Sequence, residues 1–167
     1  MEKLIEKLDS YSILNNLLPG AVFAYLFEYI FEVDIVRDGI VENLFIYYFI
    51  GMIVSRIGSL AVEPLCKKIK WVKYADYSSY IKASRKDDKI DVLSEVNNSF
   101  RTIFSLCLIL ITTKIYMLIV AWLEIPQKYN KLIVLTVITL IFAVSYRKQT
   151  KYVVDRVNKA NEQEGAE

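Results

Sequence analysis

Apolar segments long enough to cross a lipid bilayer alternate along the chain with segments rich in charged side chains. The apolar segments cover residues 17–33, 41–62, 102–123 and 132–146. A membrane-spanning helix needs about 20 predominantly apolar residues, since each residue adds about 1.5 Å to its length. The pattern therefore predicts an all-α protein, an integral membrane four-helix bundle with a cytosolic helical extension.

Helical spacing of apolar residues continues from two of the predicted spans into polar sequence. The stripe over residues 90–104 joins the third span, so we expect one helix over about residues 88–124. The fourth span continues in the same way to about residue 160, and a short helix is predicted over residues 76–84. Both long helices exceed the thickness of a bilayer, so their open ends are expected to project into the cytosol.

The N-terminal region carries its own apolar stripe at helical spacing, over residues 2–14. Residues 15–20 interrupt that stripe, and Pro19 suits the first turn of a new helix. We therefore expect an amphipathic helix that either lies on the membrane surface or extends the first span. Pro64 is expected to stop or kink the second span.

Lysine and arginine are distributed unevenly about the spans. Nine of the 21 lie in residues 67–101, two lie in the first seven residues, five follow residue 146, and three lie in the outer loops. The positive-inside rule therefore places both termini and the basic block in the cytosol. The chain is predicted to be a multi-pass protein of the bacterial inner (cytoplasmic) membrane. Its net charge of +2 gives no reason to expect a nucleic-acid partner.

This topology divides the chain into five segments, and it makes the lipid bilayer the first partner that the sequence implies. The segments are an amphipathic N-terminal helix over residues 1–16, transmembrane helices one and two over 17–65, a cytosolic helical block over 66–101, transmembrane helices three and four over 102–146, and a cytosolic C-terminal helix and tail over 147–167.

The composition removes the commonest catalytic and metal chemistry. The chain has no histidine, which excludes Ser–His and Cys–His nucleophile pairs and His-ligated zinc. Its two cysteines, Cys66 and Cys107, make no metal motif and are expected to be reduced near the cytosol. The acids between residues 87 and 95 alternate with bases, which is typical of a solvent-exposed face. We therefore expect no catalytic residue, no metal site and no cofactor, and an enzyme that acts on lipid is disfavoured.

Ionisable residues within membrane spans are candidates for function, because burying a charge in lipid costs several kcal/mol. Three such residues are Glu28, Arg56 and Lys114. Arg56 either extends toward the interface, or bonds to helix carbonyls or to Asn15 or Asn16, or acts as a polar pore or switch residue. A pair between Glu28 and Lys114 would hold the bundle together. The alternative for Lys114 is a water-filled path or the central cavity of an oligomer.

Small residues form one face of the second span. Gly51, Ser55 and Ser59 recur at every fourth position, and Gly58 widens the face. Small residues let neighbouring helices approach closely in membranes. The face is therefore predicted to pack against another helix of the chain or to form the interface of a homo-oligomer.

Two polar groups lie at the ends of the cytosolic block: four lysines at its start, and two asparagines with an arginine at its end. The lysines of the first group are expected to contact anionic lipid headgroups, with a phosphate-bearing ligand as the alternative. Glu63 is expected to pair with Arg56 or with a neighbouring lysine. The second group forms a polar cluster where the long helix enters the bilayer, and its side chains can bond to neighbouring helix ends. The groups are Lys67, Lys68, Lys70 and Lys73, and Asn97, Asn98 and Arg101.

Three stretches carry a resemblance to a known group of proteins: NNLLPGAVFAYL, YYFIGMIVSRIGSLAVEPL and KIDVLSEVNNSFRT, within residues 15–102. They resemble small bacterial four-span membrane proteins associated with anti-phage defence loci. The resemblance includes no catalytic motif, so it assigns no active-site role. It implies an effector or anchor that acts beside a cytosolic partner.

Together these features lead us to expect a non-enzymatic, homo-oligomeric membrane sensor or effector in anti-phage defence. Its cytosolic block would meet a protein partner or a ligand, and loss of the membrane barrier would be a natural output. The alternative is a small ion channel or transporter subunit. A passive anchor for a soluble partner stays open as well.

Overall fold

The computed structural model describes the backbone of residues 2–124 and 126–164, and the side chains of residues 15–124, 126, 129 and 131–158. Every regular element in this described part of the chain is a helix, which confirms the predicted all-α class. The chain divides into two compact units, Met1–Glu124 and Ile125–Glu167, and each is described by itself.

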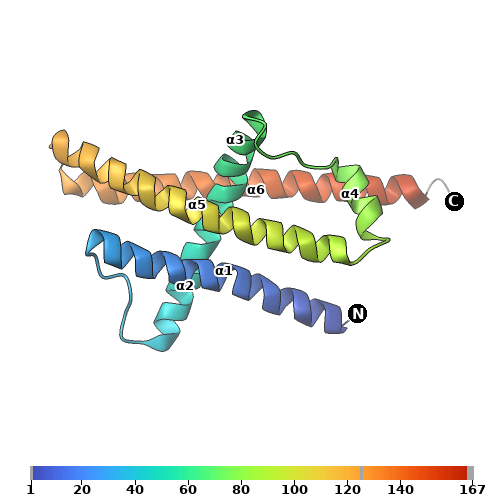
Figure 1. Cartoon of the computed structure of the whole chain (residues 1–167), viewed down its shortest axis with the longest axis horizontal. Helices are drawn as coiled ribbons and strands as arrows, with labels where there is room; N and C mark the ends of the chain where they lie inside the picture. Colours follow the sequence, from blue (N-terminus) through green and yellow to red (C-terminus); the bar gives the residue numbers. More distant parts are fainter. Residues whose placement is uncertain (1, 125, 165–167) are drawn as a thin grey trace. The chain divides into compact units, whose positions relative to one another are not determined.

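Figure 1 shows the helices coloured along the chain from blue to red. Five α-helices and one π-helical turn, η1, belong to the first unit, and α6 belongs to the second. In order they are α1 (Glu2–Phe31), α2 (Ile40–Ile57), η1 (Gly58–Val62), α3 (Glu63–Lys68), α4 (Tyr77–Ser84), α5 (Lys89–Trp122) and α6 (Gln127–Glu164).

Three helices among the described residues are long and apolar enough to cross a membrane: Ile40–Lys68, Lys89–Trp122 and Lys131–Asn158. Large apolar side chains on them are exposed, for example Phe45 at 73% and Leu118 at 63%. Soluble proteins rarely expose apolar patches of this extent, whereas lipid would cover them. The structure is therefore compatible with a membrane-embedded protein. α1 is not among the three helices, so the first of the four predicted spans stays a prediction.

The expected break between a helix over residues 1–16 and the first span is absent, because α1 is one continuous helix with Pro19 inside it. A proline in a helix lacks the backbone N–H and crowds the preceding turn. α1 packs against α2 on both sides of this proline, at Asn16 and Gly20, and the packing holds the turn helical. This continuity favours the alternative in which residues 2–14 extend the first span.

Two glycines bring α1 and α2 into backbone contact. A Cβ atom on Gly20 would overlap the carbonyl oxygen of Tyr47, and one on Gly51 would overlap the carbonyl oxygen of Asn16. The contacts are reciprocal, since each helix contributes a glycine and, one turn earlier, a carbonyl group. Such close approach permits weak Cα–H···O contacts and extensive van der Waals packing. Only glycine fits at these two positions.

Pro64 does not end the helix that begins at Ile40, so of the two expected effects, a stop or a kink, the stop is absent. The backbone passes through the π-helical turn η1 and continues as α3 to Lys68. The N–H of Glu63 bonds to the carbonyl of Gly58, five residues earlier. This wider turn accommodates the proline ring, which would otherwise clash with a carbonyl of the preceding α-helical turn.

α1 and α5 run side by side in the same direction, and α2 crosses both (Figure 1). In the first half of α1, the Ser99 hydroxyl of α5 donates to Asn15 Oδ1 over 3.3 Å. Farther along both helices, the ammonium of Lys114 lies 5.5 Å from the ring centre of Phe31. The two contacts are similarly spaced along α1 and α5, as expected for parallel neighbours.

A small apolar core lies where α2 meets α1 and α5. Its buried members are Val54 of α2 and Leu106 and Leu110 of α5. Phe23 and Phe27 of α1 pack against it, with their ring centres 5.6 Å apart. In lipid, close packing rather than the exclusion of water holds such helices together. The core therefore depends on the close crossing of α2.

The predicted short helix forms as α4. Its N-cap residue, Asp76, accepts hydrogen bonds from the backbone N–H groups of Ser78 and Ser79, which satisfies donors that a helix start leaves open. The Tyr80 hydroxyl then donates to Asp91 of α5 over 2.8 Å. Burial raises the pKa of Tyr80 above its ordinary value of 10.0, and the hydrogen bond to Asp91 raises it further.

Gly51→Ala should destabilise the protein much more than Gly39→Ala. The added Cβ at Gly51 meets the backbone of α1, whereas a Cβ at Gly39 meets the flexible side chain of Glu42 at 3.4 Å. Overpacking of this kind costs about 1–3 kcal/mol. Thermal unfolding in detergent, followed by circular dichroism, should therefore give a clearly lower midpoint for Gly51→Ala. Equal midpoints for the two variants would contradict the backbone contact.

Candidate functional site

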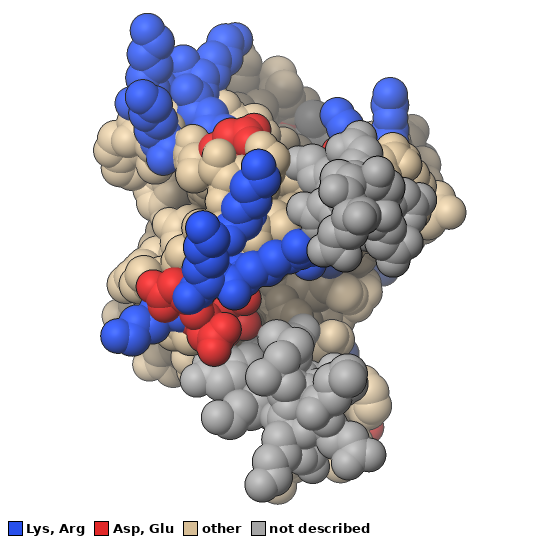
Figure 2. All heavy atoms as spheres, turned by 90° about the vertical axis from the view of Figure 1, so that its right-hand side faces the viewer, with Lys and Arg blue, Asp and Glu red and all other residues tan. Residues whose placement is uncertain are grey.

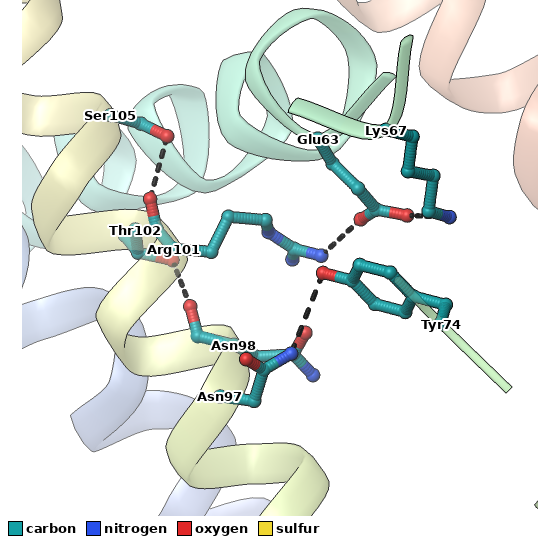
Figure 3. A network of polar contacts seen from close by, with 8 residues as sticks. All are labelled: Glu63, Lys67, Tyr74, Asn97, Asn98, Arg101, Thr102 and Ser105. Carbon is teal, nitrogen blue, oxygen red and sulfur yellow. Dashed lines mark hydrogen bonds and ion pairs between the residues drawn. The ribbon is translucent and has the colours of Figure 1, made fainter. Parts of the chain in front are cut away.

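An ion pair joins the end of the helix Ile40–Lys68, here called the second apolar helix, to α5 (Figure 3). Arg101 Nη1 donates to Glu63 Oε2 over 2.6 Å, and Lys67 Nζ lies 2.7 Å from the other carboxylate oxygen. The side chains of Glu63 and Arg101 are 11% and 17% exposed, whereas that of Lys67 is 44% exposed. Water therefore screens the pair with Lys67 more strongly. The predicted pairing of Glu63 with a lysine is confirmed, but its arginine partner is Arg101 rather than Arg56.

Further hydrogen bonds surround this pair. The Asn97 amide donates to the Tyr74 hydroxyl over 3.4 Å, and the Ser105 hydroxyl donates to the carbonyl of Arg101 over 2.7 Å (Figure 3). Gly58 makes room for α5, because a Cβ there would lie 2.7 Å from Ser105 Oγ. Two members of the predicted polar cluster, Asn97 and Arg101, thus bond to the second apolar helix and the segment that follows it.

A polar cavity of about 400 Å³ lies within the first unit, beside the ion pair. Its wall combines side chains from α1, the second apolar helix and α5. A cavity of this volume is in the range of small-molecule sites. The charged and amide side chains that line it are Asn15, Asn16, Arg56, Glu95, Asn98 and Arg101.

The two arginines of the cavity differ in their partners. Glu63 holds one end of the Arg101 guanidinium, while Nε of Arg101 is buried and has no hydrogen-bond partner in the described part of the chain. Arg56 is partly buried, and no ion pair or hydrogen bond to another described residue engages it. The bonds expected between Arg56 and Asn15 or Asn16 are therefore not formed, although all three residues line the cavity.

Glu95 belongs to the cavity, although the charge pattern around it predicted a solvent-exposed face. Glu95, Asn98 and Arg101 are three residues apart in turn, so they follow one side of α5. Tyr48 and Met52, four residues apart on α2, add to the opposite part of the wall. The spacing was visible in the sequence, but no local pattern indicated that α2 and α5 enclose one cavity.

The small-residue face of the second apolar helix is divided among two helices and the cavity. Gly51 contacts α1 and Gly58 contacts α5, so both glycines serve helix packing within the chain. Ser55 and Ser59 line the cavity. A role for this face in a homo-oligomer stays a prediction.

The expected pair of Glu28 and Lys114 is not formed between these two described side chains. The Glu28 carboxylate instead accepts hydrogen bonds from the backbone N–H groups of Ile35 and Val36, over 2.6 and 2.5 Å, and fixes the turn after α1. Lys114 is exposed, and its ammonium lies over the ring of Phe31. A cation–π contact at an exposed site is a weak attraction. Lys114 therefore keeps an uncompensated charge on a predicted span.

The predicted lysine group lies at the end of α3 and in the segment after it, where all four side chains are exposed. The Lys67 ammonium lies 4.0 Å from the ring centre of Tyr74. Trp71 packs edge-on against Phe104 of α5, with ring centres 5.3 Å apart. Figure 2, viewed from the α4 end, shows lysine and arginine side chains projecting around a few acidic ones. Exposed lysines beside aromatic rings are typical of helix ends at lipid headgroups.

Comparisons with known proteins provide no assignment. No protein-family model matches the sequence, and searches of curated proteins and of solved structures find no match. Among the residues that the structure describes, no group of three His, Cys, Asp or Glu side chains could hold a metal ion. The geometry of the cavity is therefore the basis for a functional proposal.

Arg101→Met should destabilise the protein much more than Lys67→Met. Removing Arg101 leaves the mostly buried Glu63 carboxylate without its less screened partner, which costs about 3 kcal/mol in buried pairs. The pair with Lys67 is more exposed, so its loss should cost less than about 1 kcal/mol. Thermal unfolding of the two purified variants in detergent measures the difference. Similar midpoints would show that the Glu63–Arg101 pair does not stabilise the contact between α3 and α5.

Proposed function

We propose that the chain is a non-enzymatic membrane sensor or effector, which acts in anti-phage defence as a homo-oligomer with a cytosolic protein partner or ligand. The observation that carries the sensing role is the polar cavity beside the Glu63–Arg101 pair. Three helices contribute to its wall, so a ligand with different affinity for two packings would shift the balance between them. The defence role comes from the resemblance within residues 15–102.

The proposed topology has four spans in the bacterial inner membrane, with both termini in the cytosol. The parallel course of α1 and α5 supports it, because helices that start on the same side of a membrane run in the same direction. The helix Ile40–Lys68 has 29 residues. It is about 43 Å long and exceeds the hydrocarbon thickness of about 30 Å. It can therefore cross the bilayer at a tilt.

Lys114 supports the proposed homo-oligomer. Its ammonium is exposed, and a charge that faces lipid within a span costs several kcal/mol. Packing against a second copy, or around a water-filled centre, would remove this cost. The same residue favours the alternative function, a small ion channel or transporter subunit. Steady flux of a defined solute through liposomes without any trigger would distinguish that alternative from an effector.

Single cysteines on the two sides of the membrane should label differently in spheroplasts. With Cys66 and Cys107 replaced by alanine, Asp38→Cys tests the proposed outer loop and Lys86→Cys the cytosolic block. Both positions are exposed, so burial limits neither reaction. A membrane-impermeant maleimide should modify Asp38→Cys at once and Lys86→Cys only after lysis. Immediate labelling of Lys86→Cys would contradict the topology.

Cells that express the wild-type chain should have a lower membrane potential than cells that express Arg56→Leu or Lys114→Leu at equal levels. Both substitutions remove a charge that a conductive path between the helices would need. Lys82→Leu removes an exposed lysine of α4 and should behave as the wild type. Depolarisation lost in the first two variants supports a path through the spans. Equal potentials in all four populations would overturn an effector that acts without a trigger and leave a gated effector or a passive anchor.

A further inference from the structure

We propose that the polar cavity binds a phosphate group, carried either by a lipid headgroup or by a small soluble ligand. The inference rests on the proposed function, because it names the class of ligand that the sensing site would take. The observation behind it is the presence of Arg56 of α2 and Arg101 of α5 in the wall of one cavity.

Arg56 carries a positive charge in the cavity wall that no described carboxylate neutralises. Arg56 and Arg101 line the cavity, against a single carboxylate from Glu95. Glu63 compensates Arg101 through Nη1, whereas no ion pair joins Arg56 to any described carboxylate. Water screens the charge of Arg56 less because the side chain is partly buried. An anion in the cavity would pair with that charge.

The wall also offers hydrogen-bond donors. A guanidinium such as that of Arg56 carries five N–H donors. The Asn98 amide and the Tyr48 hydroxyl can also donate. An ionised phosphate offers only acceptors, and its oxygens point in several directions. It can therefore accept from α2 and α5 together, and arginine binds it with paired, parallel bonds.

The size of the cavity indicates a ligand larger than the phosphate group. A volume of about 400 Å³ is in the range of small-molecule sites. Glu95 lies nearly two helical turns before Arg101 on α5, toward the cytosolic block. Its carboxylate would accept a hydrogen bond from an ammonium or hydroxyl group attached to the phosphate. Phosphoethanolamine and phosphoglycerol headgroups have this combination, and so do soluble sugar phosphates.

The position of the cavity along α5 allows both kinds of ligand to reach it. Arg101 directly precedes the apolar stretch of this helix, and the Trp71–Phe104 pair lies at the same end. Such aromatic side chains are enriched at the boundary between lipid and water. In the proposed topology the cavity thus lies at the depth of the cytosolic headgroups. A headgroup would enter from the bilayer and a soluble phosphate from the cytosol.

The first arm of the test uses inorganic pyrophosphate and the full chain in a detergent with an uncharged headgroup. Thermal unfolding is followed as pyrophosphate is added, with chloride and acetate at equal ionic strength as controls. The midpoint should rise for the wild type and for Arg37→Gln, whose side chain is exposed in the loop after α1. For Arg56→Gln the apparent affinity should fall about tenfold or more, because a charged donor is lost.

The second arm uses nanodiscs of phosphatidylcholine, with or without phosphatidylglycerol, whose headgroup carries hydroxyl groups beside the phosphate. Phosphatidylglycerol should raise the unfolding midpoint of the wild type and of Arg37→Gln more than that of Arg56→Gln. Arg56→Gln is preferred to Arg101→Gln, because Arg101 also pairs with Glu63 in the fold. A response in the first arm alone identifies a soluble ligand, and one in the second arm alone identifies a headgroup.

A response in either arm that Arg56→Gln loses supports the proposal. The proposal is overturned by no response in both arms, by equal responses of Arg56→Gln and the wild type, or by an equal effect of chloride and acetate. Depolarisation of cells without phosphate binding would keep the effector function and remove this inference. Phosphate binding without depolarisation would keep the inference and remove that output.

Discussion

The close approach of the second apolar helix to its two neighbours is the contact on which the first unit depends. Gly51 brings this helix into backbone contact with α1, and Gly58 brings it against Ser105 of α5. The two glycines are two turns apart, so they hold α1 and α5 at separate positions and leave Arg56 between them. The cavity is the space that remains between these contacts. A larger side chain at either glycine would separate the helices that form its wall.

The π-helical turn η1, which begins at Gly58, lets the helix continue past Pro64. Because this turn is wider than an α-helical turn, it also changes the side of the helix that the following residues face. In a regular helix, Glu63 would lie two turns from Arg56 on the same side. After η1 it reaches Arg101 of α5 instead. The turn therefore forms the ion pair with α5 and leaves Arg56 to the cavity.

The sequence by itself determined that the chain is helical and where α4, α5 and α6 lie. The helices expected over residues 76–84 and about 88–124 correspond to α4 and α5, and the one expected to continue to about residue 160 corresponds to α6. Apolar spacing and run length are local properties of the chain, so they can be read without knowledge of any partner. The membrane character followed from the same local signal.

The tertiary structure alone decided whether helices continue through the prolines and which partners the charged side chains have. Helix α1 continues through Pro19 where Asn16 and Gly20 pack against α2, and the sequence near the proline does not show that α2 lies there. Glu63 meets Arg101, and Glu28 binds the backbone after α1, because the helix crossing fixes which side chains come within reach. Contacts between residues far apart in the sequence depend on the relative register of whole helices. The glycine contacts set that register, and the cavity with its two arginines is the result.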